Sequence, residues 1–290
     1  MISEPALDRL TAMFQEPDVS GTRYTLISVL GRGGMGVVYL AHDSMLDRDV
    51  ALKIVERPQA EPNEARILAR LEHPGIVPVH DFGELPDGRL FYAMKRVRGD
   101  RLDRWMASGR ELTDRLGVFL RVCDAVAFAH AQGVIHRDLK PENVMVGEFG
   151  EVLVLDWGLA LRNGDCGLRI ERTVVGTPDY MAPEQARGDT AVDHRADVFS
   201  LGAMLGSIAD TAPLLAIARK ARAADPGDRY PDVPALSADI SRFLAGRAVE
   251  AHRERLVDRL ARFGRRYRLP ILLVLTYLVV RVLMLWLFRV

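Results

Sequence analysis

The segment His136-Arg137-Asp138-Leu139-Lys140-Pro141-Glu142-Asn143 decides how this sequence is interpreted. It places a carboxylate at Asp138, an ammonium group at Lys140 and an amide at Asn143 within a few residues of one another. A carboxylate can accept a proton from a hydroxyl group, and an amide oxygen can bind a hard metal ion. We therefore interpret this segment as part of an active site.

Two further segments follow it along the chain. Val154-Leu155-Asp156-Trp157-Gly158 places an acidic residue after an apolar run, thirteen residues after Asn143. Gly176-Thr177-Pro178-Asp179-Tyr180-Met181-Ala182-Pro183-Glu184 comes next. In these three segments the chain resembles the eukaryotic-type serine/threonine protein kinases, in the branch found in bacteria. The resemblance extends over roughly residues 24–244.

This resemblance implies an α+β fold of two lobes, a β-rich N-lobe with one helix and a helical C-lobe. It also implies a serine/threonine protein kinase, which transfers the γ-phosphate of ATP to protein hydroxyl groups. Asp138 would orient the substrate hydroxyl, and Lys140 would steady the migrating phosphoryl group and indicate serine/threonine specificity. Asn143 and Asp156 would hold Mg²⁺, in whose place Mn²⁺ is also allowed. Trp157 replaces the family's phenylalanine and keeps a large aromatic side chain there.

Three glycines upstream, Gly31, Gly33 and Gly36, form a G-x-G-x-x-G pattern. Glycine lets backbone amides approach phosphate groups because it has no Cβ atom. A dinucleotide-binding Rossmann turn would need a helix after the glycines, whereas the following VVYLAHD is typical of a strand. The pattern therefore favours a kinase-type loop. By resemblance, the ATP-binding residues are Leu30, Gly31, Arg32, Gly33, Gly34, Met35, Gly36, Val38, Ala51, Lys53, Met94, Val97 and Met145.

Lys53 lies in an apolar stretch, Ala51-Leu52-Lys53, that is typical of a strand. A buried lysine costs free energy unless it is paired, whereas an edge strand could direct it to water. Glu64, in an expected helix over residues 61–72, is the candidate partner and is assigned to catalysis with Lys53. Glu61 competes with it, although a position before Pro62 is more typical of a helix cap. Only ten residues separate Lys53 from Glu64, fewer than the family usually has.

The resemblance also assigns supporting roles. Asp197 would brace the loop that carries Asp138, and Arg229 would pair with Glu184. Thr177 would hydrogen-bond the catalytic aspartate and lysine. A hydrophobic column would comprise Leu68, Val79, His136 and Trp157.

Regulation is expected at Thr173, four residues before Thr177. The resembling family places its main activating phosphothreonine in this loop, and Arg137 is the expected partner of the phosphate. A second copy of the chain would phosphorylate Thr173, because confinement on a membrane raises the effective concentration.

The chain is shorter than the family pattern after Leu201-Gly202-Ala203-Met204-Leu205. Residues 208–213 lead almost directly to the last helices, so a substrate-docking helix is missing. The missing portion contributes to docking of proteins and not to phosphoryl transfer, so we expect catalysis to survive while substrate recognition changes. Lys95 also replaces an acidic residue common at its position, which leaves the ribose contacts unassigned.

Composition adds three expectations. Lysine plus arginine and aspartate plus glutamate both number 39, and we expect no nucleic-acid partner. The two cysteines, Cys123 and Cys166, lack metal-type spacing and are expected to be idle thiols in a reducing compartment. The N-terminal residues contain no apolar run, so no signal peptide is expected.

The C-terminal residues predict a membrane anchor. Residues 253–268 contain seven arginines against two acidic residues, and the 19 residues of 270–288 are mostly apolar. Such a helix is about 28 Å long, close to the ~30 Å hydrocarbon core. Arg281 opposes insertion by roughly 2.5–3.5 kcal/mol, whereas the leucine, isoleucine, valine and phenylalanine residues return about 4–8 kcal/mol. We expect a single-pass helix in the cell membrane, contacting lipid, with the arginine-rich side and the kinase domain in the cytoplasm. A buried amphipathic helix is the alternative.

The expected organisation has four parts. They are a leader over residues 1–23, a kinase domain over 24–250, a basic juxtamembrane segment over 251–268 and a transmembrane helix over 269–289. Two functions remain open, an active kinase and an ATP-binding pseudokinase that acts as a scaffold. A complete set of Lys53, Asp138, Asn143 and Asp156 favours the enzyme, whereas the missing docking helix favours the scaffold.

Overall fold

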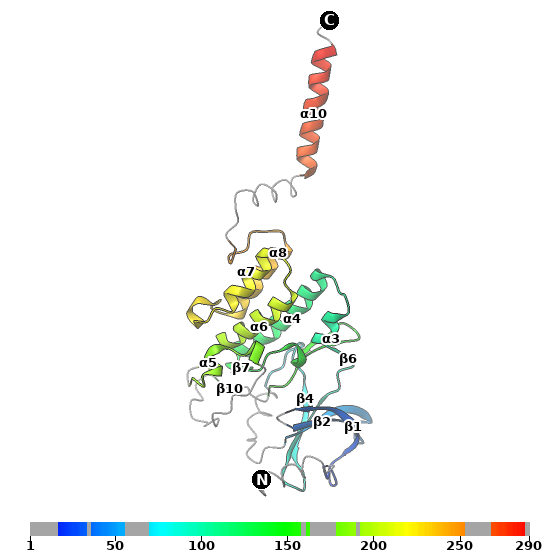
Figure 1. Cartoon of the computed structure of the whole chain (residues 1–290). Coiled ribbons are helices and arrows are strands. Elements are labelled where there is room, and N and C mark those ends of the chain that lie inside the picture. Colours follow the sequence, from blue (N-terminus) through cyan, green and yellow to red (C-terminus); the bar gives the residue numbers. More distant parts are fainter. Residues whose placement is uncertain are drawn as a thin grey trace.

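The structure is a computed structural model that describes residues 17–33, 36–55, 70–157, 161–162, 178–189, 192–252 and 268–287. Figure 1 shows a lobe built on a β-sheet and a larger lobe of helices, followed by a separate C-terminal helix. A hinge, residues 95–98, connects the two lobes. The predicted two-lobed α+β fold is therefore confirmed.

The N-lobe is a five-stranded antiparallel sheet in the order β1-β2-β3-β5-β4. Of the helix predicted over residues 61–72, the described residues 70–72 are not helical, so the prediction is wrong at this end, and residues 61–69 lie outside the described residues. The strands are β1 (Tyr24–Gly33), β2 (Gly36–Asp43), β3 (Arg48–Val55), β4 (Val79–Glu84) and β5 (Leu90–Lys95).

Alternation along β3 decides which side chains face the C-lobe. Successive residues of a strand point to opposite faces of the sheet. Leu52 and Ile54 belong to an outer core of the N-lobe, whereas Ala51 and Val55 join the large core that continues into the C-lobe. Lys53 lies between Ala51 and Val55 in this alternation, so its side chain points towards the C-lobe.

The C-lobe consists of helices and short strands around one large hydrophobic core. Its helices are α3 (Leu102–Ala107), α4 (Leu112–Ala131), α5 (Pro183–Ala186), α6 (Arg195–Ile208), α7 (Ala212–Ala221) and α8 (Val233–Leu244). Its short strands are β6 (Gly99–Arg101), β7 (Val134–Ile135), β8 (Val144–Gly147), β9 (Val152–Val154) and β10 (Leu161–Arg162). Single 3₁₀ turns are η1 (Pro141–Asn143), η2 (Pro178–Tyr180) and η3 (Pro226–Asp228).

Helix α4 leads directly into the catalytic segment and packs in the core of the C-lobe. Its buried side chains, including Phe119, Val122 and Val126, recur at helical spacing and pack into the core. The helix ends where Gly133 adopts a φ of +74°, a conformation that glycine allows at low cost. The chain then turns directly into β7 and the segment that begins at His136.

The short connection predicted after residues 201–205 is present. Helix α6 ends at Ile208 and α7 begins at Ala212. The two helices pack closely, because a Cβ atom on Gly202 would lie 2.6 Å from the Cβ atom of Ala221. Helix α7 therefore packs directly on α6, with no additional helix between them.

The end of the C-lobe is fastened by Asp239, which is fully buried on α8. Its carboxylate accepts hydrogen bonds from the backbone N–H groups of Glu250 and Ala251 and from the hydroxyl of Tyr230. Burial would raise the pKa of Asp239, but these donors lower it. The globular body therefore extends through residue 251.

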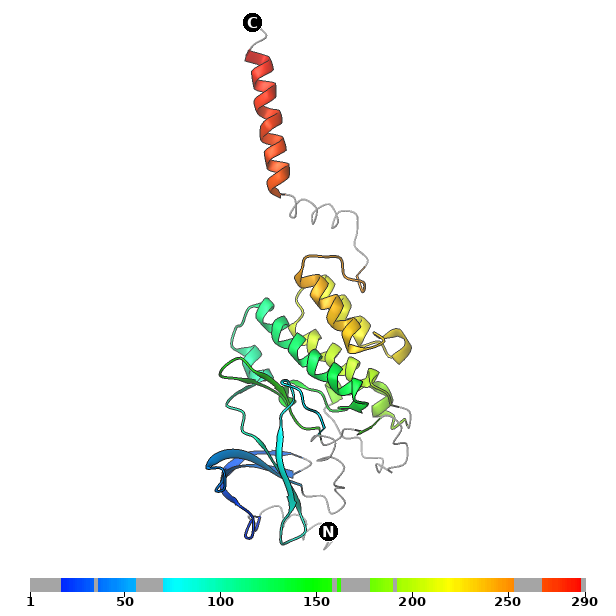
Figure 2. The same ribbon diagram turned by 180° about the vertical axis from the view of Figure 1, so that it is seen from behind.

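Helix α10 (Arg268–Leu287) stands apart from both lobes in Figures 1 and 2. Within the part of the chain that the structure describes, no helix has the combination of length and apolar character that crossing a membrane requires. The predicted transmembrane helix is therefore not confirmed. Exposed apolar or aromatic side chains of α10 are Leu272, Leu273, Val274, Leu275, Tyr277, Leu278, Val279, Val280, Leu283 and Met284.

Candidate active site

Asp138, Lys140 and Asn143 converge as the sequence predicted. The ammonium group of Lys140 donates to Oδ2 of Asp138 at 2.8 Å. The side-chain amide of Asn143 donates to the backbone oxygen of Asp138 at 2.8 Å and to its Oδ2 at 3.1 Å. These contacts fix the orientation of the Asp138 carboxylate, which is the requirement for a group that must accept a hydrogen bond from a substrate hydroxyl.

Asp197 braces this loop from α6. Its buried carboxylate accepts the backbone N–H groups of His136 and Arg137, each at 2.8 Å, and lies 2.7 Å from Nε2 of His130. Burial would raise the pKa of Asp197, but the hydrogen bond from His130 and the nearby histidines lower it. The predicted bracing role of Asp197 fits this geometry.

The brace compensates for backbone strain. Arg137 has a φ of +69°, a conformation uncommon for residues other than glycine. Gln185 at the start of α5 adds a further hydrogen bond, from Nε2 to the backbone oxygen of Arg137 at 2.9 Å. A strained residue persists only where the surroundings hold it, so the contacts of Asp197 and Gln185 position the catalytic segment.

Lys53 pairs with Asp156, across the two lobes. Lys53 is a buried residue, only 5% exposed, and its ammonium group donates to Oδ1 of Asp156. Burial would raise the pKa of Asp156, but the charge and hydrogen bond of Lys53, with smaller contributions from His136 and Lys140, lower it below its usual value. The predicted alternative of a solvent-facing lysine is therefore wrong. The predicted partner Glu64 lies outside the described residues.

Trp157, the residue after Asp156, packs against His136 of the catalytic segment. Its side chain is fully buried, and its ring centre lies 4.6 Å from that of His136. Nε2 of His136 lies 2.9 Å from the backbone oxygen of Leu155. Trp157 therefore fills the packing role that was expected of an aromatic side chain at this position. Of the remaining predicted column residues, Val79 packs against the same core and Leu68 lies outside the described residues.

The glycine pattern forms a β-hairpin and not a strand followed by a helix. Gly31 lies opposite Val38, and Gly33 lies opposite Gly36. Gly36 has a φ of +142°, and a Cβ atom there would lie 2.0 Å from the backbone oxygen of Ile54. This position therefore requires glycine. Gly34 and Met35, which follow Gly33 in the sequence, lie outside the described residues.

The other predicted ATP contacts lie on the strands and hinge that surround the hairpin. Ala51 of β3 is paired with Met94 of β5, and Val38 of β2 is paired with Lys53. These side chains face the interlobe core. Leu30 and Arg32 lie on β1, Val97 lies in the hinge, and Met145 lies on β8 of the C-lobe.

The donor set fits a hard divalent metal ion. Asp156 offers a carboxylate and Asn143 an amide oxygen, and oxygen ligands are what Mg²⁺ and Mn²⁺ prefer. Across the described ranges no group of three or more histidine, cysteine, aspartate or glutamate residues could hold a metal ion. Two protein ligands match an ion that completes its coordination with water and substrate phosphates.

Glu184 and Arg229 form the predicted ion pair behind the site. Nη1 and Nη2 of Arg229 each donate to one carboxylate oxygen of Glu184 at 2.7 Å, and both side chains are buried. The pair ties α5 to the segment before α8. Thr173 and Thr177 lie outside the described residues.

His130 and Gln185 are positioning residues that the sequence analysis missed. His130 lies six residues before His136 on α4, where a histidine on an apolar helix face was the available signal. Gln185 directly follows Glu184 and carried no distinguishing pattern. Their partners, Asp197 and Arg137, are distant in sequence, so only the fold brings them together.

Comparison with known proteins gives the same assignment as the geometry. The profile of the protein kinase domain matches residues 24–256. The serine/threonine-protein kinase PknD of Chlamydia caviae is 33% identical, with 77% of this chain and 31% of that protein covered. PknB of Mycolicibacterium smegmatis is 36% identical, with 81% and 45% covered. A probable serine/threonine-protein kinase of Streptomyces coelicolor is 40% identical, with 69% and 32% covered. The chain thus spans about a third to a half of the length of these curated relatives.

Proposed function

Because the chain belongs to the protein kinase family, we propose that it transfers the γ-phosphate of ATP to serine and threonine hydroxyls of proteins. The observation that carries the proposal is the convergence of Asp138, Lys140, Asn143, Asp156 and Lys53 at the junction of the two lobes. These residues come from both lobes and from segments up to 103 positions apart.

The residues divide the reaction between them. Asp138 accepts the hydrogen bond of the substrate hydroxyl and directs its oxygen towards the γ-phosphorus. Lys140, already hydrogen-bonded to Asp138, lies where its charge can stabilise the phosphoryl group during transfer. Lys53 positions the phosphates of ATP under the glycine hairpin. Asn143 and Asp156 would hold Mg²⁺ or Mn²⁺, which when bound neutralises charge on the phosphates.

The alternative of a pseudokinase scaffold is not favoured. A pseudokinase typically lacks one of the groups that bind phosphate, metal or the substrate hydroxyl. Here Lys53, Asp138, Asn143 and Asp156 are all present, and each makes the contacts described above. The short connection between α6 and α7 changes the surface available to protein substrates and leaves these contacts in place.

Transfer of radiolabelled phosphate from ATP to a generic protein substrate tests the proposal. We expect activity for the full chain and for Asp114→Asn, a matched control because Asp114 is exposed on α4. Asp138→Asn and Lys53→Met should lose activity by two or more orders of magnitude while retaining the circular dichroism of the wild type. Wild-type activity in either variant would show that the assignment is incorrect.

We propose in addition that phosphorylation of Thr173 activates the enzyme. The support is Arg137, whose partly buried guanidinium has Nε and Nη1 without a hydrogen-bond partner among the described residues. Burial lowers the pKa of Arg137, with an opposing contribution from Asp197, because a charged group in this position is poorly solvated. A phosphate would supply charge and acceptor oxygens for this guanidinium. A second copy of the chain is the proposed source of the phosphate.

Mass spectrometry after incubation with ATP and Mg²⁺ tests this proposal. We expect phosphate on Thr173, with an initial rate per molecule that rises with protein density on vesicles. Thr173→Ala should have lower activity, whereas Thr22→Ala, at a site remote from Arg137, should not. An unmodified Thr173, or a fully active Thr173→Ala variant, would contradict it.

We further propose that the C-terminal segment attaches the chain to the cell membrane, with the kinase domain in the cytoplasm. The support is the row of exposed apolar side chains on α10 and the arginine-rich residues 253–268 before it. Contact with lipid removes these apolar side chains from water, which is favourable. The basic residues are attracted to the negatively charged cytoplasmic leaflet. The membrane lipid is therefore the proposed partner of this segment.

Flotation with vesicles tests the attachment. The full chain should float with vesicles and resist carbonate extraction if α10 is inserted, whereas a chain ending at Arg268 should remain behind. Release by carbonate alone would indicate surface attachment. Failure of the full chain to float would contradict the proposal.

A further inference from the structure

The N-lobe sheet is buried on the face turned away from the C-lobe, which we call the outer face. Strand pairing sets Leu52 opposite Tyr39 on one side and opposite Ala93 on the other. An antiparallel sheet commonly leaves one of its faces in contact with water. Burial of both faces therefore indicates a further layer on the outer one. The side chains of the outer face, each at most 7% exposed, are Tyr39, Ala41, Leu52, Ile54, Phe91 and Ala93.

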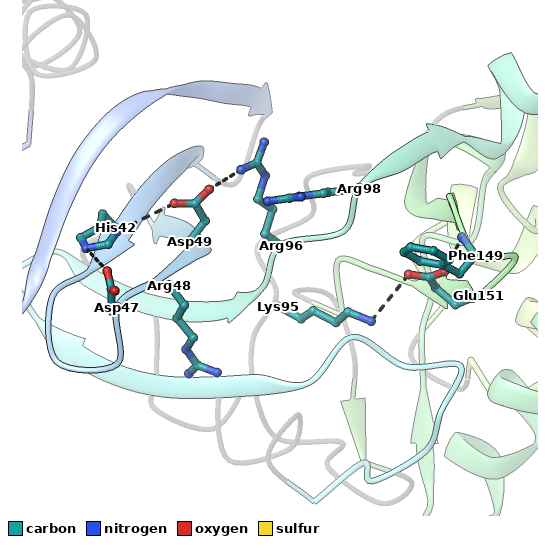
Figure 3. Close-up of a pocket in the computed structure, with 9 residues that line it drawn as sticks. All are labelled: His42, Asp47, Arg48, Asp49, Lys95, Arg96, Arg98, Phe149 and Glu151. Carbon is teal, nitrogen blue, oxygen red and sulfur yellow. Dashed lines mark hydrogen bonds and ion pairs between the residues drawn. The ribbon is translucent and has the colours of Figure 1, made fainter.

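The C-lobe is not this layer, because it lies against the opposite face of the sheet. In the register of β2 and β3, Ala41 lies opposite Val50, and the next pair is His42 and Asp49. Successive residues point to opposite faces. Figure 3 shows Asp49 directed towards Arg96 of the hinge, with which it forms an ion pair. The inner face therefore meets the hinge and the C-lobe.

The described part of the chain supplies little cover for the outer face. Among its partly buried apolar side chains, those that pack against the outer core are Val19 and Leu26. Val19 precedes β1 and Leu26 lies on it, and β1 is the first strand in the order β1-β2-β3-β5-β4. Phe91 lies on β5, three strands further along, and is only 5% exposed. Two side chains at one edge do not cover the sheet as far as β5.

The chain enters the described region on this side of the sheet. Pro17 is buried, and Val19 packs against the outer core. The backbone oxygen of Val19 accepts hydrogen bonds from the N–H of Thr22 at 3.1 Å and from its hydroxyl at 2.8 Å, which hold Val19 in place. Residues 1–16 lie outside the described residues and are joined directly to Pro17. They are therefore within reach of the outer face.

Residues 1–16 have the pattern of an amphipathic helix. Ser3 is a typical N-cap, and Pro5 is tolerated in a first turn. Pro17 disfavours helical structure at the residue before it. A helix over residues 4–15 is about 18 Å long, whereas β2 and β5 lie roughly 10 Å apart. Its apolar side chains recur three or four residues apart and form one stripe of Ala6, Leu7, Leu10, Met13 and Phe14.

We propose that residues 4–15 form an amphipathic helix that packs across the outer face of the N-lobe sheet of the same chain. The apolar stripe contacts the outer face, and the polar side chains of the helix face water. This packing is favourable because it removes two apolar surfaces from water. It also gives the sheet a packed layer on each of its faces.

Other segments outside the described residues are less suited to this place. Residues 56–69 contain Glu64, the predicted partner of Lys53, and the side chain of Lys53 points away from the outer face. Residues 163–177 and 253–267 are joined to described residues of the C-lobe. Residues 1–16 are joined to the N-lobe itself.

The charge of residues 1–16 disfavours a membrane as the partner of this helix. They contain three acidic side chains and one arginine. Amphipathic helices that lie on anionic membranes are rich in lysine and arginine. A partner without negative charge, such as the apolar outer face, is therefore favoured.

The docked helix also supports the strand that carries Lys53. Leu52 and Ile54, on the outer face, are the neighbours of Lys53 on β3. A layer packed on these two side chains restrains the strand, so the ammonium group of Lys53 stays close to Asp156. This consequence rests on the proposed kinase function, whereas the packing of the helix does not.

Photo-crosslinking of the full chain in phospholipid nanodiscs tests the position of the helix. Phe14 is replaced by p-benzoylphenylalanine, which keeps an aromatic ring at this position. After illumination we expect mass spectrometry to find links from position 14 to β2, β3 or β5. The same replacement at Gln15, on the polar side of the predicted helix, should give these links in a several-fold lower yield.

Thermal unfolding tests the contribution of the apolar stripe. Leu10→Asp places a charge against the outer face, so its Tm should lie about 5 °C or more below that of the wild type. Gln15→Asp adds the same charge on the polar side and should change the Tm by less than about 2 °C. The affinity for a non-hydrolysable ATP analogue should fall by about fivefold in Leu10→Asp and stay unchanged in Gln15→Asp.

The proposal is overturned if position 14 links to lipid, to the C-lobe or only to a second copy of the chain, which a mixture of isotopically light and heavy chains identifies. Equal Tm values for Leu10→Asp and Gln15→Asp would also overturn it. Unchanged nucleotide affinity in Leu10→Asp would overturn the support of Lys53. Because crosslinking does not depend on phosphoryl transfer, an inactive enzyme with the expected links would contradict the proposed function alone.

Discussion

Removal of one partner of the buried Glu184–Arg229 ion pair should destabilise the C-lobe strongly. Both side chains are almost inaccessible to water, at 7% and 0% exposure, and two hydrogen bonds of 2.7 Å join them. Glu184→Gln leaves the guanidinium of Arg229 buried without a counter-charge. Its other acceptors are the backbone oxygens of Ala223, Ala224 and Arg195, which carry no full charge.

The magnitude follows from the burial of the pair. Breaking a buried ion pair by removing one partner costs about 3–5 kcal/mol, whereas a pair on the surface is worth at most about 1 kcal/mol. For a domain of this size, each kcal/mol lowers the Tm by about 2–4 °C. We therefore expect the Tm of Glu184→Gln to lie roughly 6–20 °C below that of the wild type.

Thermal and urea unfolding of the wild type and its variants measure this difference. Arg187→Gln is the matched control, because the Arg187–Asp189 pair is exposed and close to Glu184 in sequence. The double variant Glu184→Gln/Arg229→Met should recover part of the lost stability, since it leaves no buried charge. A Tm of Glu184→Gln within 2 °C of the wild type would refute this reasoning, as would a larger loss in Arg187→Gln.

Three further predictions concern the catalytic segment and the glycine hairpin. Trp157→Ala should lower the free energy of unfolding by about 3–5 kcal/mol in urea titrations, because the buried ring packs on His136. Trp157→Phe should lower it by much less, and similar losses in both variants would contradict this. Gly36→Ala should destabilise the chain by about 1–3 kcal/mol and raise the KM for ATP, because its Cβ atom would clash with the backbone oxygen of Ile54. Gly117→Ala is the control, because a Cβ atom at Gly117 has free space around it and should not destabilise α4. The pKa of Asp197 is lowered by folding, so its stabilising contribution is present above the unfolded value of about 3.9 and is lost as pH falls through the folded value. The free energy of unfolding should therefore fall more steeply below pH ~4 in the wild type than in Asp197→Asn, and parallel slopes would count against this role of Asp197.

The parts of the site that lie close together in sequence were predictable from it. Asp138, Lys140 and Asn143 lie within six positions, and the turn that joins them brings their side chains into contact almost by itself. The hairpin at Gly31–Gly36 was likewise distinguished from a helix-opening turn by the strand-like residues that follow it. In both cases the structure is decided by short-range sterics and hydrogen bonds.

The contacts between distant residues were less accessible to sequence reasoning. Lys53 was predicted to need a counter-charge because a buried ammonium group is costly, but no local pattern names Asp156 as the residue that supplies one. The pairing of Glu64 with Lys53 and the phosphorylation of Thr173 stay predictions, since both residues lie outside the described ranges. Asp197 and Arg229 were assigned through resemblance to a family and not from their neighbours in sequence.

The roles of His130 and Gln185 depend wholly on the tertiary structure. Each side chain meets its partner from a segment that is separated by tens of residues, and the two segments come together only when the C-lobe has packed. Their sequence neighbourhoods are ordinary, because the demand on these residues comes from a strained backbone or a buried carboxylate on another segment. The amino-acid sequence by itself determined the fold class and the chemistry of the catalytic segment, through the local conformational preferences of its residues and the spacing of its motifs. Packing decided which distant charges and donors face one another, because burial makes an unpaired polar group costly only once the surrounding chain has excluded water.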